Sequence, residues 1–342
     1  MLLSRLKQQI LIRAYSFARS LAAALGALAF TACSAPVGTL YYGALAKGQS
    51  VIIISSAKTT ANVGTNAVVS YDVNGNFLDQ LADLTSPNQR PRGVAAFDPF
   101  NIIVALDGAS KILAKTSLFG SYSTFVPSTS FSGNLYQIAK YDNGSGYYYS
   151  IVGNTIDAFD STGARVSATA APVVATTTGA CVLSGPAGLF IDSTNKRMFV
   201  TNGGSTSLLV YDLTTHSAPT CQTASTALGA VNAVGVLKHS NGYLYVTSSA
   251  EPSTGVKLWA LSGDGVGAAT AVYTDATGTV LNYSTAITEL PDGSILIANS
   301  GTNQIDRFQV DALNAATRVG TTAFIKDVFT TLVTSIQVIR GM

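Results

Sequence analysis

Eight polar residues lie at two recurring points of a repeated strand pattern and form the main candidate site. Those that end one type of strand are Asp107, Asn154, Asn202, Ser248 and Asn299. Those that begin the next type of strand are Arg92, Asn134 and Asn232. Most of these side chains offer oxygen atoms, and Ca²⁺ binds oxygen ligands. The pattern therefore indicates a candidate binding face with room for Ca²⁺, or else turn residues whose oxygens cap the backbone.

Side chains for nucleophilic or zinc catalysis are scarce. The chain has only two histidines, His216 and His239, and both fall where exposed loops are expected. It has no Gly-x-Ser-x-Gly and no Cys-x-x-Cys motif, which are typical of a nucleophile elbow and of a zinc site. We therefore assign no catalytic residue, no metal ligand and no cofactor, with Ca²⁺ as the one cation that the oxygen-rich face could hold.

Six short β-rich runs position these polar residues. They are residues 51–56, 101–106, 147–152, 197–202, 243–248 and 294–299. The last three begin at residues 197, 243 and 294, a spacing close to the roughly 40–50 residues of a four-stranded propeller blade. Side chains alternate between the faces of a strand. Tyr147 and Tyr149 should therefore share the face that packs between blades, and Tyr148 should face the other way.

Flanking segments complete a four-stranded unit around each run. An apolar segment precedes the run, as at 93–98, 188–192 and 286–290. Residues 334–339 form a lone strand of this first type, whereas the pattern begins at Val51 with a strand of the second type. We therefore predict one all-β domain over residues 51–342. It is a six-bladed β-propeller of four-stranded blades, closed when the C-terminal strand joins the N-terminal blade.

The four residues Phe199-Val200-Thr201-Asn202 match the core of the YVTN repeat almost literally. On this motif and its flanking strands, the chain resembles the NHL and YVTN classes of β-propeller over nearly all of residues 50–342. The resemblance implies a fold, and such propellers host unrelated activities. The gluconolactonase-like enzymes of this group hold a divalent metal with a Glu, an Asn and an Asp. This chain departs from that metal-binding set. Its blade starts supply Asn134 and Asn232 but no Glu or Asp, and Glu289 falls within an inner strand, past the expected position.

Residues 1–32 have the composition of an export signal. They contain four basic residues, no acidic residue, and an apolar run over 21–30 that ends in small residues. Phe30-Thr31-Ala32-Cys33 resembles the lipobox of bacterial lipoproteins, which implies a lipid on Cys33, and Ser34 implies sorting to the periplasmic face of the outer membrane. Residues 33–50 would then form a tether. The alternative is an ordinary cleaved signal and a soluble periplasmic or secreted protein.

Cys181 and Cys221 are predicted to form a disulfide, because an exported chain reaches an oxidising compartment. Cys181 precedes an inner strand, whereas Cys221 belongs to the outer strand of the same blade. The inner and outer strands of one blade are separated by two other strands, which is farther than the Cα–Cα distance that a disulfide can bridge. The irregular stretch over 170–184 must therefore carry Cys181 outward, and the alternative is two buried thiols.

The charge balance excludes nucleic acid as a partner. Lys and Arg number 20 against 18 Asp and Glu, and four of the basic residues precede Cys33, so no basic surplus remains to neutralise phosphates. We expect a non-enzymatic binding or scaffolding propeller of the bacterial cell envelope. Its partners would be envelope proteins, and its membrane contact the lipid on Cys33. The alternative is a metal-dependent hydrolase of the gluconolactonase-like class.

Replacing Cys33 with Ala should release the protein from the membrane fraction, because the substitution removes the one expected lipid anchor. Fractionation after a high-salt wash, with metabolic lipid labelling, measures this. Continued membrane association of an unlabelled Cys33→Ala variant would contradict the anchor.

Overall fold

The computed structural model describes residues 49–340 apart from 58–65, 85–88, 99–100, 110, 116–121, 132, 143–145, 168–170, 206, 229–231, 250–255, 276, 313–314 and 327–331. The predicted signal and the predicted lipidation site at Cys33 lie outside the described residues. In the described part, no helix has the length and apolarity that crossing a membrane requires.

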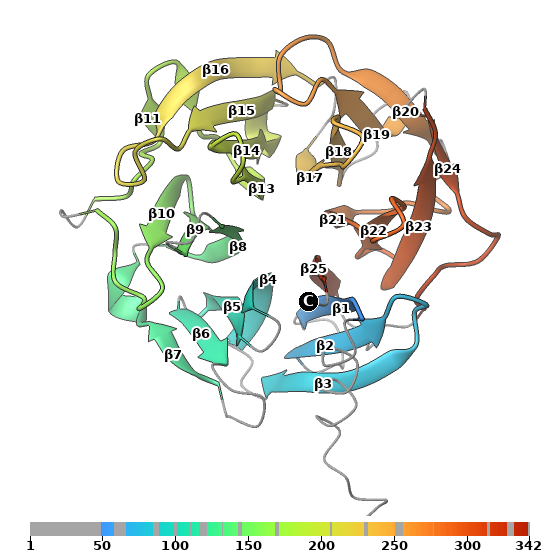
Figure 1. Cartoon of the computed structure of the whole chain (residues 1–342), viewed down its shortest axis with the longest axis horizontal. Coiled ribbons are helices and arrows are strands. Elements are labelled where there is room, and N and C mark those ends of the chain that lie inside the picture. The colour runs from blue at the N-terminus through green and yellow to red at the C-terminus, as the bar shows by residue number, and fades with distance from the viewer. Residues whose placement is uncertain are drawn as a thin grey trace, which may run out of the picture.

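Runs rich in β-branched and aromatic residues form six antiparallel sheets around a central axis (Figure 1). From the axis outward, blade 1 contains β25 (Leu332–Ile339), β1 (Val51–Ala57), β2 (Asn66–Asp72) and β3 (Phe77–Leu84). Blade 2 contains β4 (Gln89–Asp98), β5 (Asn101–Gly108), β6 (Lys111–Lys115) and β7 (Ser123–Val126). Blade 3 contains β8 (Leu135–Tyr141), β9 (Tyr147–Val152) and β10 (Thr155–Phe159).

The other three blades follow the same order. Blade 4 contains β13 (Pro186–Asp192), β14 (Arg197–Asn202), β15 (Ser207–Asp212) and β16 (Thr220–Ala227). Blade 5 contains β17 (Ala233–Lys238), β18 (Leu244–Ser248), β19 (Val256–Leu261) and β20 (Thr270–Thr274). Blade 6 contains β21 (Ser284–Glu289), β22 (Ile295–Asn299), β23 (Gln304–Val310) and β24 (Ala316–Arg318). The predicted six-bladed ring is therefore confirmed.

A few short elements lie between these strands. They are the hairpin β11 (Thr177–Thr178) and β12 (Cys181–Val182) and the 3₁₀ turns η1 (Ser128–Ser130) and η2 (Gly203–Ser205). Blade 3 has no fourth named strand among the described residues. Isolated bridges from Ile156 to Val174 and from Phe159 to Arg165 place the following segment along its outer edge.

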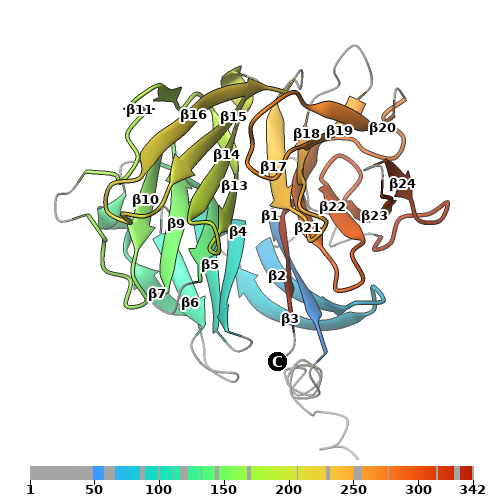
Figure 2. The ribbon, with the colours of Figure 1, turned by 45° about the horizontal axis from the view of Figure 1, so that its top comes forward.

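The direction of the strands defines two faces of the ring. Each inner strand begins at what we call the upper face and ends at the lower face, where the C-terminus lies (Figure 2). The second strand of each blade is antiparallel to the first, so it ends at the upper face. The links between blades therefore lie on the upper face together with the turns between second and third strands.

The two ends of the domain close the ring within blade 1. β25 pairs with β1 in a register that sets Ile336 opposite Ile54. The hydroxyl oxygens of Ser55 and Thr334, 279 positions apart, lie 2.9 Å from each other. Ile54 and Ile336 pack in a cluster shared with blade 6, and Ile53 packs in a cluster shared with blade 2. The predicted closure is confirmed, and it buries both faces of blade 1.

Hydroxyl groups join the inner strands of neighbouring blades. Thr201 of β14 accepts a hydrogen bond from Gly188 N at 2.7 Å and donates one to Val234 O, in the next blade, at 2.7 Å. Thr334 of β25 donates to Pro91 O of blade 2 at 2.7 Å. Glycine permits the close approach, because a Cβ atom at Gly188 would collide with Val234 O.

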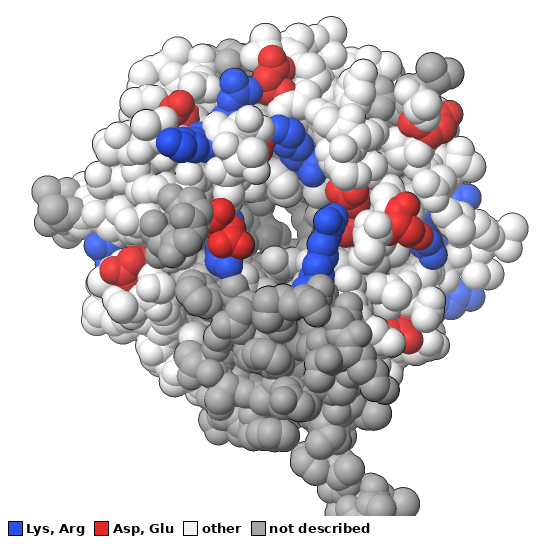
Figure 3. Space-filling view, in the orientation of Figure 1, with Lys and Arg blue, Asp and Glu red and all other residues white. Residues whose placement is uncertain are grey.

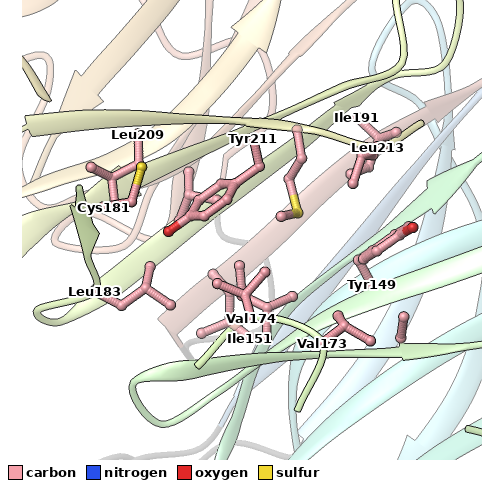
Figure 4. Close-up of a cluster of buried hydrophobic side chains, with 14 of the residues drawn as sticks. Tyr149, Ile151, Val173, Val174, Cys181, Leu183, Ile191, Leu209, Tyr211 and Leu213 are labelled. Carbon is pink, nitrogen blue, oxygen red and sulfur yellow. The ribbon is translucent and has the colours of Figure 1, made fainter. Parts of the chain in front are cut away.

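The predicted disulfide between Cys181 and Cys221 is present, with a Cα–Cα distance of 5.7 Å. The β11–β12 hairpin carries Cys181 away from the axis, to the side of β16. Figure 4 shows Cys181 beside Leu183 and Tyr211 in the buried cluster between blades 3 and 4. The expected outward course of residues 170–184 therefore accounts for the bridge.

The tyrosines of blade 3 alternate as predicted. Tyr149 is buried in the cluster between blades 3 and 4 (Figure 4). Tyr147 packs against that cluster. Tyr148 is buried in the cluster between blades 2 and 3. One strand thus supplies aromatic packing to both of its neighbours.

Deleting residues 332–342 removes β25 and should unfold the whole ring. The loss exposes the blade 1 edge and several buried side chains worth about 1.5–3 kcal/mol each, against a total stability of about 5–15 kcal/mol for a typical domain. Deleting only residues 340–342 leaves β25 intact and is the matched control. If the protein without residues 332–342 melted at the same temperature as the protein without residues 340–342, closure of the ring by β25 would be refuted.

Candidate functional site

The eight sequence-predicted polar residues all belong to the upper face. Arg92 and Asp107 lie in β4 and β5, and the others lie at or beside the upper ends of first and second strands in blades 3 to 6. They are spread around the ring rather than gathered at one point. Among the described residues, no group of three His, Cys, Asp or Glu side chains is arranged to hold a metal ion.

Three of the asparagine side chains cap the backbone. Asn202 Oδ1 accepts a hydrogen bond from Ser184 N at 2.6 Å. Asn299 Oδ1 accepts one from Asn282 N at 3.0 Å, and Asn154 Oδ1 accepts one from Gly185 N at 3.1 Å. Each bond ties the link that enters an inner strand to the end of a second strand. These oxygens therefore have the turn-capping role that the sequence left open as an alternative.

Asn134 and Asn232 contribute through their main chains. Asn134 O accepts a hydrogen bond from Gly153 N at 3.0 Å, and Asn232 O accepts one from Ser249 N at 3.0 Å. Ser248 is buried at the upper end of β18. These residues shape the upper face without converging on a common point.

Asp107 is a buried acid of the upper face and has only 2% of its surface exposed. Its Oδ2 lies 2.9 Å from Arg90 Nη2 and 3.2 Å from Arg92 Nε. Its Oδ1 is buried and has no hydrogen-bond partner in the described part of the chain. Two half-buried guanidinium groups therefore share one carboxylate, which leaves this part of the rim positively charged.

Tyr283 has an unusual backbone conformation on the same face. Gly185, Asn232 and Tyr283 each lie directly before an inner strand, with φ of 59°, 54° and 54°. In each case the carbonyl accepts a hydrogen bond from the residue after the second strand, as Tyr283 O does from Ser300 N at 3.0 Å. Gly and Asn adopt this left-handed region readily, but a bulky aromatic residue there is strained. Tyr283 is nevertheless 61% exposed.

A second exposed tyrosine lies on the opposite side of the ring. Tyr136, in β8 of blade 3, is 37% exposed, and blade 3 faces blade 6 across the axis (Figure 1). Its carbonyl lies beside Gly93, the neighbour of Arg92 in β4. The upper rim thus combines two tyrosines with two arginines. The binding face predicted from the sequence included only Arg92 of these four residues. Tyr283 could have been noticed, because other blades have Gly or Asn at its position.

The axis contains a cavity of about 620 Å³ that all six inner strands line. Much of its wall is apolar, with Leu189, Phe190, Val236, Leu237 and Ile287 among the lining residues. Charged side chains line its lower end, and Figure 3 shows Lys, Arg, Asp and Glu gathered around the central hollow on that face.

Most charges around this lower mouth are paired. Lys238 forms an ion pair with Asp192, and Lys140 Nζ lies 3.3 Å from Asp142 Oδ2. Burial raises the pKa of Asp192, but hydrogen bonds from Lys238 and Asn195 outweigh it and hold that pKa below its ordinary value. Glu289 accepts a hydrogen bond from Ser240 N at 3.0 Å.

The histidines differ from the expected exposed loop residues. His239 is only 6% exposed, because its turn folds against blade 6, where Nε2 lies 2.7 Å from Gly293 O. His216 is half-buried against the tyrosines of blade 3. Its Nδ1 lies 2.8 Å from Tyr149 Oη, and its ring centroid lies 4.2 Å from that of Tyr147. The expectation was wrong for His239 because the sequence does not show which turns meet a neighbouring blade.

Comparisons with known proteins identify the fold alone. No family model and no curated protein sequence matches this chain. A solved nidogen/laminin complex contains a similar chain, with a TM-score of 0.63 and 12% identity over 86% of this chain and 99% of that one. A putative 6-phosphogluconolactonase from Bacteroides fragilis has a TM-score of 0.54 and 12% identity over 85% and 98%. A streptogramin B lyase has a TM-score of 0.56 and 17% identity over 84% and 92%.

His216 should make the stability of the ring depend on pH. Burial, reinforced by the charge of Lys196, lowers the pKa of His216 from its ordinary value of 6.5. Below about pH 6.5 the unfolded chain therefore binds a proton that the folded chain does not. The stabilisation by neutral His216 is complete above that pH and is lost as the pH falls towards the folded-state pKa.

The melting temperature of His216→Gln should therefore fall by less than that of the wild type between about pH 7.5 and pH 5. Thermal denaturation in a series of buffers at constant ionic strength measures the difference. Parallel curves for the two proteins would contradict this role of His216.

Proposed function

We propose that this chain is a non-enzymatic binding or scaffolding propeller of the bacterial cell envelope. It is exported, attached through a lipid on Cys33 to the periplasmic face of the outer membrane, and binds an envelope protein with its upper rim. The observation that carries the proposal is Tyr283, an exposed aromatic residue in a strained backbone conformation at that rim.

The strain argues for a role outside folding. A non-glycine residue in a sparsely populated backbone region costs about 1–3 kcal/mol. Blades 4 and 5 have Gly185 and Asn232 at the same point, and both satisfy the same carbonyl hydrogen bond with less strain. Tyrosine and arginine are enriched at protein interfaces, because each combines a large contact area with polar groups. Tyr136 and Arg92 extend the rim with the same two residue types.

The capping asparagines support binding over metal-dependent hydrolysis. The oxygens of Asn154, Asn202 and Asn299 already accept backbone hydrogen bonds. A metal ion at these oxygens would compete with those bonds at the entry to the inner strands. The disulfide is compatible with export to an oxidising compartment.

Tyr283→Asn separates a binding role from a structural one. Asn tolerates the left-handed region, so relief of strain should raise the melting temperature, by about 2–4 °C per kcal/mol for a domain of this general size. After crosslinking in intact cells, an envelope protein should co-purify with the wild type and should be absent from the purified Tyr283→Asn variant. Tyr243→Asn, at a tyrosine that is 41% exposed in a lower-face turn, is the matched control and should retain it.

Two results would contradict the proposal. One is an unchanged set of crosslinked proteins in Tyr283→Asn, with or without a gain in stability. The other is stoichiometric Ca²⁺ or Zn²⁺ in the purified protein together with lactone hydrolysis, which would support the gluconolactonase-like alternative instead.

A further inference from the structure

We infer that the axial cavity is a binding site for a small amphiphilic carboxylate of the N-acyl amino acid class, with the carboxylate at the lower mouth and the acyl chain inside. This site lies at the opposite end of the axis from the upper rim. It does not depend on the proposed partner of that rim.

The cavity has the size and rigidity of a ligand site. Its volume of about 620 Å³ falls within the roughly 300–1,000 Å³ of small-molecule sites. Its wall consists of the inner strands of all six blades. The hydroxyl of Thr201 joins blade 4 to blade 5, and that of Thr334 joins blade 1 to blade 2. The site is therefore formed before any ligand arrives, and binding needs little ordering of the protein.

The part of the wall just inside the lower mouth suits an apolar chain. Blades 4, 5 and 6 contribute Leu189, Phe190, Val236, Leu237 and Ile287 to the lining. These side chains are anchored in buried strands, so an acyl chain that displaces water from them gains hydrophobic stabilisation. A fully polar ligand would leave this surface without a matching partner.

Arg340 supplies the group that selects a carboxylate. Lys140, Lys238, Asp142 and Glu289 also line the cavity, and each has an ion pair or a hydrogen bond. Arg340 is exposed and has no ion pair with any residue that the structure describes. A guanidinium group binds a carboxylate through two parallel hydrogen bonds. Among the described residues that line the mouth, Arg340 is therefore the cation without an ion pair.

Gln337 supplies an acceptor deeper in the channel. It lines the same cavity, and its Oε1 is buried without a hydrogen-bond partner among the residues that the structure describes. Gln137 also lines the cavity, but its Nε2 donates to Thr334 O at 3.2 Å. A buried acceptor without a donor is destabilising, and a ligand N–H would satisfy it.

The order of these groups along the axis defines the ligand. Arg340 directly follows β25 at the mouth, Gln337 lies three residues further in on β25, and the apolar side chains lie beside Gln337 and one or two residues further in. An N-acyl amino acid has a carboxylate, an adjacent amide N–H and an apolar chain in the same order. A fatty acid lacks the N–H donor, and an acyl amide lacks the charge.

Isothermal titration with N-octanoylglycine tests this inference. The purified mature protein should bind it, and Arg340→Gln should weaken binding at least tenfold while the melting temperature is retained. Octanoylglycinamide, which lacks the charge, should bind the wild type at least tenfold more weakly than N-octanoylglycine and bind both proteins alike. Lys326→Gln removes an exposed cation outside the cavity and should match the wild type.

A second pair of ligands tests Gln337. Octanoyloxyacetate replaces the amide N–H with an ester oxygen and should bind the wild type more weakly than N-octanoylglycine. Gln337→Met removes the acceptor at similar volume and should abolish that difference. Absence of binding to the wild type, or equal affinity of wild type and Arg340→Gln, would overturn the proposal.

Discussion

Pairing between the first and last strands of the domain is the constraint on which the other features depend. β25 and β1 meet along their whole length, and the hydroxyl groups of Ser55 and Thr334 connect across 279 positions of the chain. Without this ladder, blade 1 would lose its innermost strand and its neighbours would each lose a packing face. The axial cavity and the upper rim exist only while the ring is closed, because each takes residues from blades on both sides of the junction.

Contacts between inner strands explain why a short sequence motif identifies this architecture. In Phe199-Val200-Thr201-Asn202, the threonine joins its own inner strand to that of the next blade, and the asparagine caps the link that precedes the blade. Both polar residues therefore have structural roles. A motif whose polar residues are used in this way predicts the fold and leaves the function open.

The sequence was most informative where a pattern is local. Strand periodicity placed Tyr148 and Tyr149 on opposite faces, and the unpaired strand types at the two ends predicted closure. The outward course of Cys181 followed from the excess length of its link. Features that depend on a neighbouring blade were missed. The burial of His239 arises from contact with blade 6. The left-handed conformation of Tyr283 was also missed, although it lies within one blade, where Tyr283 O accepts a hydrogen bond from Ser300 N.

Amide hydrogen exchange of the intact protein tests the central claim most directly, namely that the six blades form one cooperative ring closed by β25. The account predicts that the amides of β1 and β25 exchange as slowly as those of β14 and β18, through the same global opening. Fast exchange in β1 and β25, with protection retained in blades 4 and 5, would show that blade 1 opens on its own and would contradict this account.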